Sequence, residues 1–272
     1  MAKSLQALVG VESDSAQVVW HLRDFAQEIG ASLVGGYQVT CSDEAEWECA
    51  RGFQQGFVEP LMPGLKPGFR APLRSANLGG RFERGAIRIA EEHFASAQTP
   101  GEFKLLVVKI NSHVGACATA DGVQYGWTER YGQPLACCGT LAALLGGKGP
   151  PAIAELRDTF RSGGTDRLAV LRDERVVPPP YRALLAAVVN ARLQAERAAA
   201  EAVRHAPRTP TIYLIVSCVT LNRPGPDTEI VVGQHGIDWT GGAAAVKYQG
   251  LGDDPASYRL QHREGRLYLA ES

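Results

Sequence analysis

Two adjacent cysteines, Cys137 and Cys138, precede an apolar segment that runs from Leu141 to Leu145 and ends at Gly146-Gly147. The apolar segment predicts a short helix, which places both thiols at its N-terminus. Unpaired backbone N–H groups and the positive end of the helix dipole favour a thiolate there. Because a thiolate is both a nucleophile and a metal ligand, this pair is the first candidate for chemistry.

A general base for such a thiol is expected in the strand at residues 103–114. His113 and Asn111 are both in it, and alternate residues of a strand share a face. A cysteine, a histidine and an orienting asparagine can act as nucleophile, base and positioning group. We predict a catalytic group with Cys138 as the nucleophile, made of Cys138, Cys137, His113 and Asn111. The alternative is that the two cysteines are small buried side chains.

Soft metal ligands are present, but they lack the local spacing of zinc motifs. The chain contains no Cys-x-x-Cys and no His-Glu-x-x-His. His113 and Cys117 are close in sequence, but they straddle a strand end rather than share a helical face. The sequence therefore predicts no metal site, although thiols and imidazoles are available at Cys41, Cys49, His93, His113, Cys117, Cys137, Cys138 and Cys218.

A segment rich in arginine and glycine is the third candidate. It opens onto an expected helix N-terminus, where backbone N–H groups can bind an anion that glycine allows to approach closely. Arginine adds forked hydrogen bonds to carboxylate or phosphate. We predict an anion-binding segment made of Arg70, Arg74, Asn77, Gly79, Gly80, Arg81 and Arg84. The alternative is that these arginines form surface ion pairs with nearby glutamates.

The elements that must position these residues alternate between helices and strands. Apolar periodicity predicts strands at about 5–11, 32–40, 103–114 and 211–221, and helices at about 14–30, 42–57, 81–97, 151–162 and 181–205. The proline-rich stretch 58–80 is expected to be an irregular loop. Strand 211–221 is expected to pair with 229–233, and a hairpin of 258–262 with 266–269 closes the chain. We expect the Ala-rich helix 181–205 to lie on the sheet.

These elements predict a mixed α/β fold, with a central mixed sheet covered by helices and an antiparallel, β-rich C-terminal third. With 272 residues, 45% of them hydrophobic, the chain is predicted to form a single α/β domain (1–272), with two related halves at about 1–125 and 126–272 as a possibility. The six cysteines, which lack a disulfide-type spacing, favour a reducing compartment, so we expect a cytoplasmic protein.

The net charge and the hydropathy of the chain limit the classes of partner that the sequence favours. A formal net charge of −1 and the lack of a long apolar run predict neither nucleic-acid nor membrane binding. We expect a small anionic molecule as ligand and a homo-oligomer as the assembly, and the sequence assigns no cofactor. The leading hypothesis is an enzyme that performs acyl or C1-unit transfer or hydrolysis with a Cys/His pair. The rival hypothesis is a non-catalytic assembly or ligand-binding protein with structural cysteines.

Overall fold

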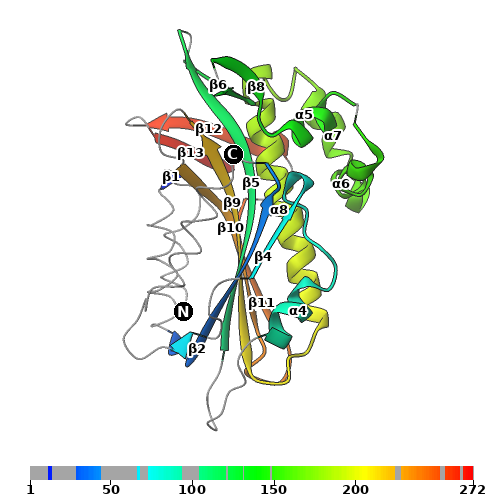
Figure 1. The fold of residues 1–272 in the computed structure, drawn as a ribbon, viewed down its shortest axis with the longest axis vertical. Helices are drawn as coiled ribbons and strands as arrows, with labels where there is room; N and C mark the ends of the chain where they lie inside the picture. Colours follow the sequence, from blue (N-terminus) through cyan, green and yellow to red (C-terminus); the bar gives the residue numbers. More distant parts are fainter. Residues whose placement is uncertain are drawn as a thin grey trace.

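The computed structural model describes residues 12–13, 29–43, 66–67, 73–93, 104–120, 122–130, 132–147, 149–223, 228–251, 255–263 and 266–271. Within these ranges a nine-stranded mixed sheet runs through the molecule (Figure 1), in the order β1-β10-β9-β5-β2-β3 with β4, β6 and β11 joined at the sides. Its strands are β1 (Glu12–Ser13), β2 (Leu33–Cys41), β3 (Lys66–Pro67), β4 (Leu73–Asn77), β5 (Lys104–Thr119), β6 (Gly122–Tyr125), β9 (Thr211–Asn222), β10 (Thr228–Asp238) and β11 (Ala245–Gly250).

The three central strands β2, β5 and β9 are parallel. Parallel strands end at the same edge of a sheet. Cys41, the last residue of β2, therefore lies beside the C-terminal part of β5, and β9 ends at the same edge on the other side of β5. In register, His113 of β5 faces Thr220 of β9. Strand β10 is antiparallel to β9, and β11 is antiparallel to β10. The predicted mixed sheet with an antiparallel C-terminal third is confirmed.

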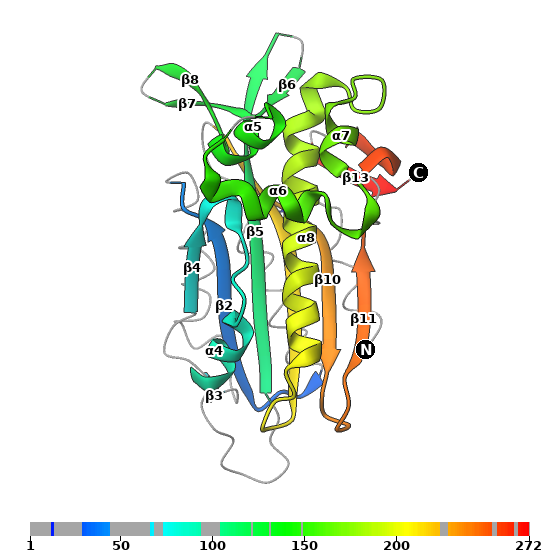
Figure 2. The ribbon, with the colours of Figure 1, turned by 90° about the vertical axis from the view of Figure 1, so that its right-hand side faces the viewer.

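Helix α8 (Arg182–Arg204) lies along one face of this sheet, together with the shorter α4 (Ala86–His93) (Figure 2). Its small residues Ala186, Ala187, Ala191, Ala195 and Ala198 are at most 1% exposed. Alanine lets a helix approach a sheet closely, so the core forms between α8 and strands rich in valine, leucine and isoleucine. The expectation that this helix lies on its own sheet is confirmed. No helix among the described residues is long and apolar enough to span a membrane.

Smaller elements gather at the carboxyl edge of the central strands (Figure 2). A hairpin projects there, and short helices connect it to α8. These elements are β7 (Trp127–Arg130), β8 (Gln133–Ala136), α5 (Gly139–Leu145), α6 (Ala154–Phe160) and α7 (Arg167–Arg172), with 3₁₀ turns at Leu78–Gly80 (η2), Pro151–Ile153, Ser162–Gly164, Pro179–Tyr181 and Pro255–Ser257. The last hairpin, β12 (Tyr258–Arg263) with β13 (Arg266–Glu271), pairs as predicted.

Two expectations need correction. Residues 73–77 are not an irregular loop, because β4 pairs in parallel with β2. Its side chains alternate between exposed and half-buried, which is typical of a short edge strand with little apolar signal. The helix expected at 81–97 begins only at Ala86 and is described to His93. The expected strand 5–11, helix 42–57 (except Ser42 and Asp43) and most of helix 14–30 lie outside the described residues.

A buried histidine in this fold predicts a pH-dependent stability. His235 of β10 is 8% exposed, and the centre of its ring lies 4.5 Å from the centre of the Tyr248 ring. The guanidinium carbon of Arg192 lies over the Tyr248 ring, 5.3 Å from its centre. Burial, assisted by the Arg192 charge, lowers the pKa of His235 to about 4.

The unfolded chain, with a histidine pKa of about 6.5, binds more protons than the folded chain between about pH 4 and 6.5. The stabilisation that comes from keeping His235 neutral is therefore fully present above pH 6.5 and is lost as the pH falls toward 4. We expect this loss to lower the free energy of unfolding by about 3 kcal/mol over that interval. Urea unfolding at pH 4.5 and pH 7 should show a smaller pH dependence for His235→Phe than for the wild type. An equal dependence in both proteins would contradict this account.

Candidate functional site

Three buried side chains from distant parts of the chain meet at the carboxyl edge of the parallel strands. Cys41 ends β2, His113 lies on β5, and Cys138 immediately precedes α5. One ligand atom of each lies within 4.8 Å of those of the other two, and the two sulfur atoms are 3.7 Å apart. The three residues are between 1% and 3% exposed. The fold thus brings together two thiols that are 97 positions apart in sequence.

The imidazole of His113 is held from both sides. Its Nδ1 lies 2.8 Å from the Oδ1 atom of Asn222, the last residue of β9. Cys137 Sγ is 3.5 Å from the same nitrogen and 3.4 Å from the same oxygen. On the other side of the ring, Nε2 lies 3.9 Å from Asp43 Oδ2. An amide oxygen accepts only, so Nδ1 carries the proton and donates it to Asn222, which leaves Nε2 as the basic nitrogen of the ring.

The two sulfur atoms of the cluster have opposite protonation tendencies. The pKa of Cys41 is lowered to about 4, first because Cys138 donates a hydrogen bond to it and then because His113 is adjacent. The pKa of Cys138 is raised, because this thiol keeps the proton that it donates to Cys41 and is buried. The backbone N–H of Gly79 also donates to Cys41 Sγ, over 3.3 Å. Hydrogen bonds to the charged form favour a thiolate, so Cys41 is the anionic member of the pair.

A pocket of about 220 Å³ lies against Cys137 and Cys138. Most of its wall is apolar, and the aromatic rings of Tyr125 and Trp127 contribute to it. The lining contains one charged side chain, Arg182 at the start of α8. An apolar pocket with few polar groups is the usual form of a small-molecule site.

The structure brings together three of the four predicted catalytic residues. Cys137, Cys138 and His113 are neighbours, but Asn111 donates to Thr220 Oγ1 at 2.8 Å, and the amide bonded to the imidazole belongs to Asn222. The catalytic assignment itself stays a prediction.

Asp43 and Asn222 were missed by the sequence analysis, and Cys41 was noted only as one of eight available ligands. All three stand at or just after strand ends, which is the one signal that could have singled them out.

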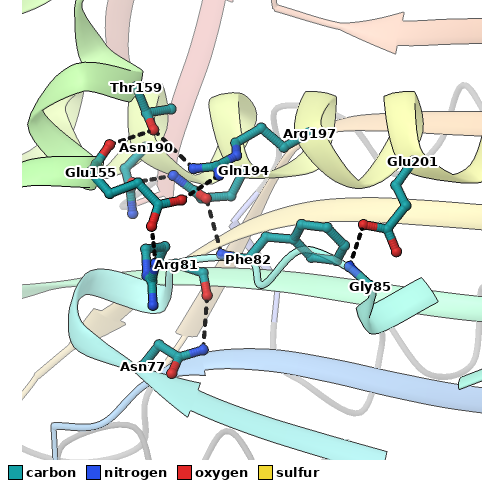
Figure 3. A network of polar contacts seen from close by, with 10 residues as sticks. All are labelled: Asn77, Arg81, Phe82, Gly85, Glu155, Thr159, Asn190, Gln194, Arg197 and Glu201. Atoms are coloured by element: carbon teal, nitrogen blue, oxygen red, sulfur yellow. Dashed lines mark hydrogen bonds and ion pairs between the residues drawn. The ribbon is translucent and has the colours of Figure 1, made fainter. Parts of the chain in front are cut away.

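Several of the predicted anion-binding residues have partners within the protein, and Figure 3 shows those of Asn77 and Arg81. Asn77 Nδ2 donates to the Arg81 carbonyl at 3.0 Å, and the Arg81 guanidinium pairs with Glu155, which also pairs with Arg197. Arg74 donates to Thr40 at 3.4 Å, Arg84 is exposed, and Arg70 lies outside the described residues. The segment therefore points its Gly79 N–H at a sulfur anion of the same chain, and an external anion there stays a prediction.

Comparisons with known proteins show the fold. No family model and no curated protein matches the chain. Solved structures do match, and two of them are PtLCIB4, a homolog of the limiting CO2-inducible protein LCIB, and a histidine-to-alanine mutant of PtLCIB4. Each is 18% identical and covers 86% of this chain, with 94% and 92% of the other chain matched and TM-scores of 0.54 and 0.53. At this identity the likeness establishes a shared α/β architecture.

Proposed function

We propose that Cys41, His113 and Cys138 bind a zinc ion, and that the protein catalyses the hydration or hydrolysis of a small electrophilic carbon compound. The observation that carries this proposal is the buried cluster of two sulfurs and one imidazole within 4.8 Å. Two thiolates and a neutral histidine are a known three-ligand set of catalytic zinc sites, which keep a fourth position for water or substrate. The donor chemistry therefore fits zinc better than calcium or magnesium, which prefer oxygen ligands.

Several residues of the chain have roles that suit such a centre. Asn222 holds the Nδ1 proton of His113, which fixes the ring and presents Nε2 as the ligand atom. Zinc bound there would act as a Lewis acid and lower the pKa of a bound water to about 7. Asp43, 18% exposed in its side chain and 3.9 Å from Nε2, is placed to accept a proton from that water.

The pocket indicates the class of substrate. Its small volume and mostly apolar wall suit a small molecule, and Arg182 would bind an anionic product or a carboxylate. Two of the matching solved structures are those of PtLCIB4, a homolog of a protein named for its induction by limiting CO2, and of a PtLCIB4 mutant. CO2, whose hydration gives bicarbonate, is therefore the first substrate to test.

The test combines metal analysis with a rate measurement. The purified protein should contain stoichiometric zinc, and stopped-flow mixing with CO2 and a pH indicator should show zinc-dependent hydration. An intact, folded protein that binds no zinc would overturn the proposal. Zinc binding without CO2 hydration would keep the metal centre and redirect the search to other small electrophiles.

Asp43→Asn should separate the metal site from the proton transfer beside it. The amide keeps the size of the side chain but accepts a proton poorly, so we expect kcat/KM to fall about 100-fold while zinc content stays unchanged. Both quantities can be measured on the same preparation. An unchanged kcat/KM would remove Asp43 from the mechanism.

A second function is favoured by one specific observation, the position of Cys137. This thiol lines the pocket and lies 3.5 Å from His113 Nδ1. In the other tautomer of the imidazole, with the proton on Nε2, Nδ1 would accept the thiol proton and leave Cys137 as a nucleophile for acyl or C1-unit transfer. Arg182 in the same pocket would suit an anionic substrate. Alkylation rates measured at neutral pH would decide: rapid labelling of Cys137 alone supports a thiol nucleophile, whereas protection of Cys41 and Cys138 by zinc supports the metal centre.

A further inference from the structure

A chain of hydrogen bonds connects the Cys41 sulfur to the middle of helix α8. Gly79 N–H donates to Cys41 Sγ at 3.3 Å, and the carbonyl of Gly79 accepts from Asn190 Nδ2 at 2.6 Å. Asn190 Oδ1 accepts in turn from Gln194 Nε2 at 3.4 Å, and Gln194 Oε1 accepts from the N–H of Phe82 at 3.0 Å. Figure 3 shows Asn190 and Gln194 on α8 above the segment that contains Arg81 and Phe82.

The amide side chains of Asn190 and Gln194 are buried in surroundings that are otherwise mostly apolar. Asn190 and Gln194 are 0% exposed and occur among the alanine and leucine residues that pack α8 onto the sheet. Burying an amide is costly unless its hydrogen bonds are made. Here the amides are four positions apart, face the same side of the helix, and bond to residues 79 and 82 on either side of Arg81.

The same asparagine also reaches the strand that carries the histidine. Asn190 Nδ2 lies 3.2 Å from the hydroxyl of Ser112, the residue before His113 on β5. One amide group therefore contacts the segment that donates to Cys41 and the strand that presents His113. Neither Asn190 nor Gln194 lies in the pocket or in the cluster of possible ligands.

We infer that Asn190 is a positioning residue of the proposed metal centre: by holding the Gly79 carbonyl it aims the Gly79 N–H at the Cys41 sulfur. The inference rests on the proposed zinc site. A hydrogen bond to a metal-bound thiolate orients the ligand and withdraws charge from the sulfur, which makes the metal a stronger Lewis acid. The glycine-rich turn η2 would then tune the metal centre without contacting the metal.

The experiment uses the full chain loaded with zinc, cobalt(II) or ¹¹³Cd. We expect Asn190→Leu, which keeps the side-chain size, to lower zinc affinity about 10- to 100-fold, as is typical for the loss of an outer-shell partner. The sulfur-to-cobalt charge-transfer band should shift to longer wavelength, since the thiolate becomes richer in electrons. In the wild type, the Gly79 amide proton should show a scalar coupling to ¹¹³Cd through the Cys41 sulfur.

Glu201→Gln is the matched control. Glu201 also lies on α8 and accepts backbone N–H groups, from Gly85 at 2.8 Å and Ile87 at 2.9 Å, but it belongs to no contact of the metal cluster. It should change stability without moving the cobalt band. If Asn190→Leu fails to fold, the wild-type ¹¹³Cd coupling still tests the hydrogen bond from Gly79 to Cys41 on which the inference depends, and its absence would overturn the inference.

The outcomes separate the inference from its premise. A wild-type protein that binds none of the three metals overturns the metal centre and the inference with it. A wild type that binds metal but shows no coupling from the Gly79 amide overturns the inference alone. An Asn190→Leu protein with unchanged affinity and an unchanged cobalt band does the same.

Discussion

Replacing Cys138 by serine is expected to abolish tight zinc binding, whereas replacing Cys137 by serine is expected to preserve it. Cys138 Sγ lies 3.7 Å from Cys41 Sγ in the proposed ligand set, while Cys137 Sγ lies beside His113 Nδ1, the nitrogen bonded to Asn222. If a zinc site worth roughly 10–16 kcal/mol is shared among its three protein ligands, losing one costs about 3–5 kcal/mol, or roughly 100- to 5,000-fold in affinity. Competition with a chromophoric chelator measures this directly.

The two variants are controls for each other. Cys137 and Cys138 are adjacent, 1% and 3% exposed, and undergo the same chemical change. A general loss of folding would affect both, so a difference in zinc affinity reports ligation. If Cys137→Ser loses zinc and Cys138→Ser keeps it, the wrong sulfur has been assigned. If Cys137→Ser keeps zinc but loses all activity, the thiol nucleophile replaces metal-dependent hydration as the function.

Gly80→Ala is expected to destabilise the folded protein by at least about 3 kcal/mol. Gly80 has a φ of +68°, and a Cβ built on it would overlap the backbone carbonyl oxygen of Asn111. The first feature costs a non-glycine residue about 1–2 kcal/mol. The overlap cannot be relieved by a side-chain rotation, because the obstructing atoms, the carbonyl group of Asn111 and the backbone nitrogen of Cys41, belong to the backbone of the central sheet. Urea unfolding measures the change in free energy.

Gly30 separates the two causes of destabilisation, the positive φ and the overlap of the added Cβ. It has the same φ of +68°, but a Cβ there would meet nothing within 4 Å. Gly30→Ala should therefore cost only the conformational part, about 1–2 kcal/mol. Equal costs at both positions would show that the sheet yields to the added methyl group. A larger cost at Gly80 would show that η2 is packed closely against β5, as its role beside Cys41 requires.

The elements with a strong local signal were predictable from the sequence. Strand β9 is a continuous apolar run, and α8 combines good helix formers with a proline stop before it, so periodicity identified both. The edge strand β4 was not predictable from the sequence. Its residues Leu-Arg-Ser-Ala-Asn lack a clear apolar alternation, and the strand forms because it pairs with β2.

The residues of the candidate site also divide into those with a local sequence signal and those without one. Residues 137 and 138 stood out because adjacent cysteines before an apolar helix form a local pattern, and His113 because alternation along a strand is local. Their partners Cys41, Asp43 and Asn222 could not be found locally. Cys41 and Asn222 reach His113 only through the parallel register of β2, β5 and β9, and Asp43 follows the end of β2.

The sequence by itself determined the fold class, the central elements β5, β9 and α8, and the presence of thiols and an imidazole that could do chemistry. The tertiary structure decided which of them meet. It joined Cys41 to Cys138 across 97 positions and turned the glycine-rich segment, predicted to bind an external anion, toward the Cys41 sulfur. The physical reason is that hydrophobic periodicity fixes local structure, whereas ligand sets depend on sheet register and helix packing, which involve residues far apart in the chain.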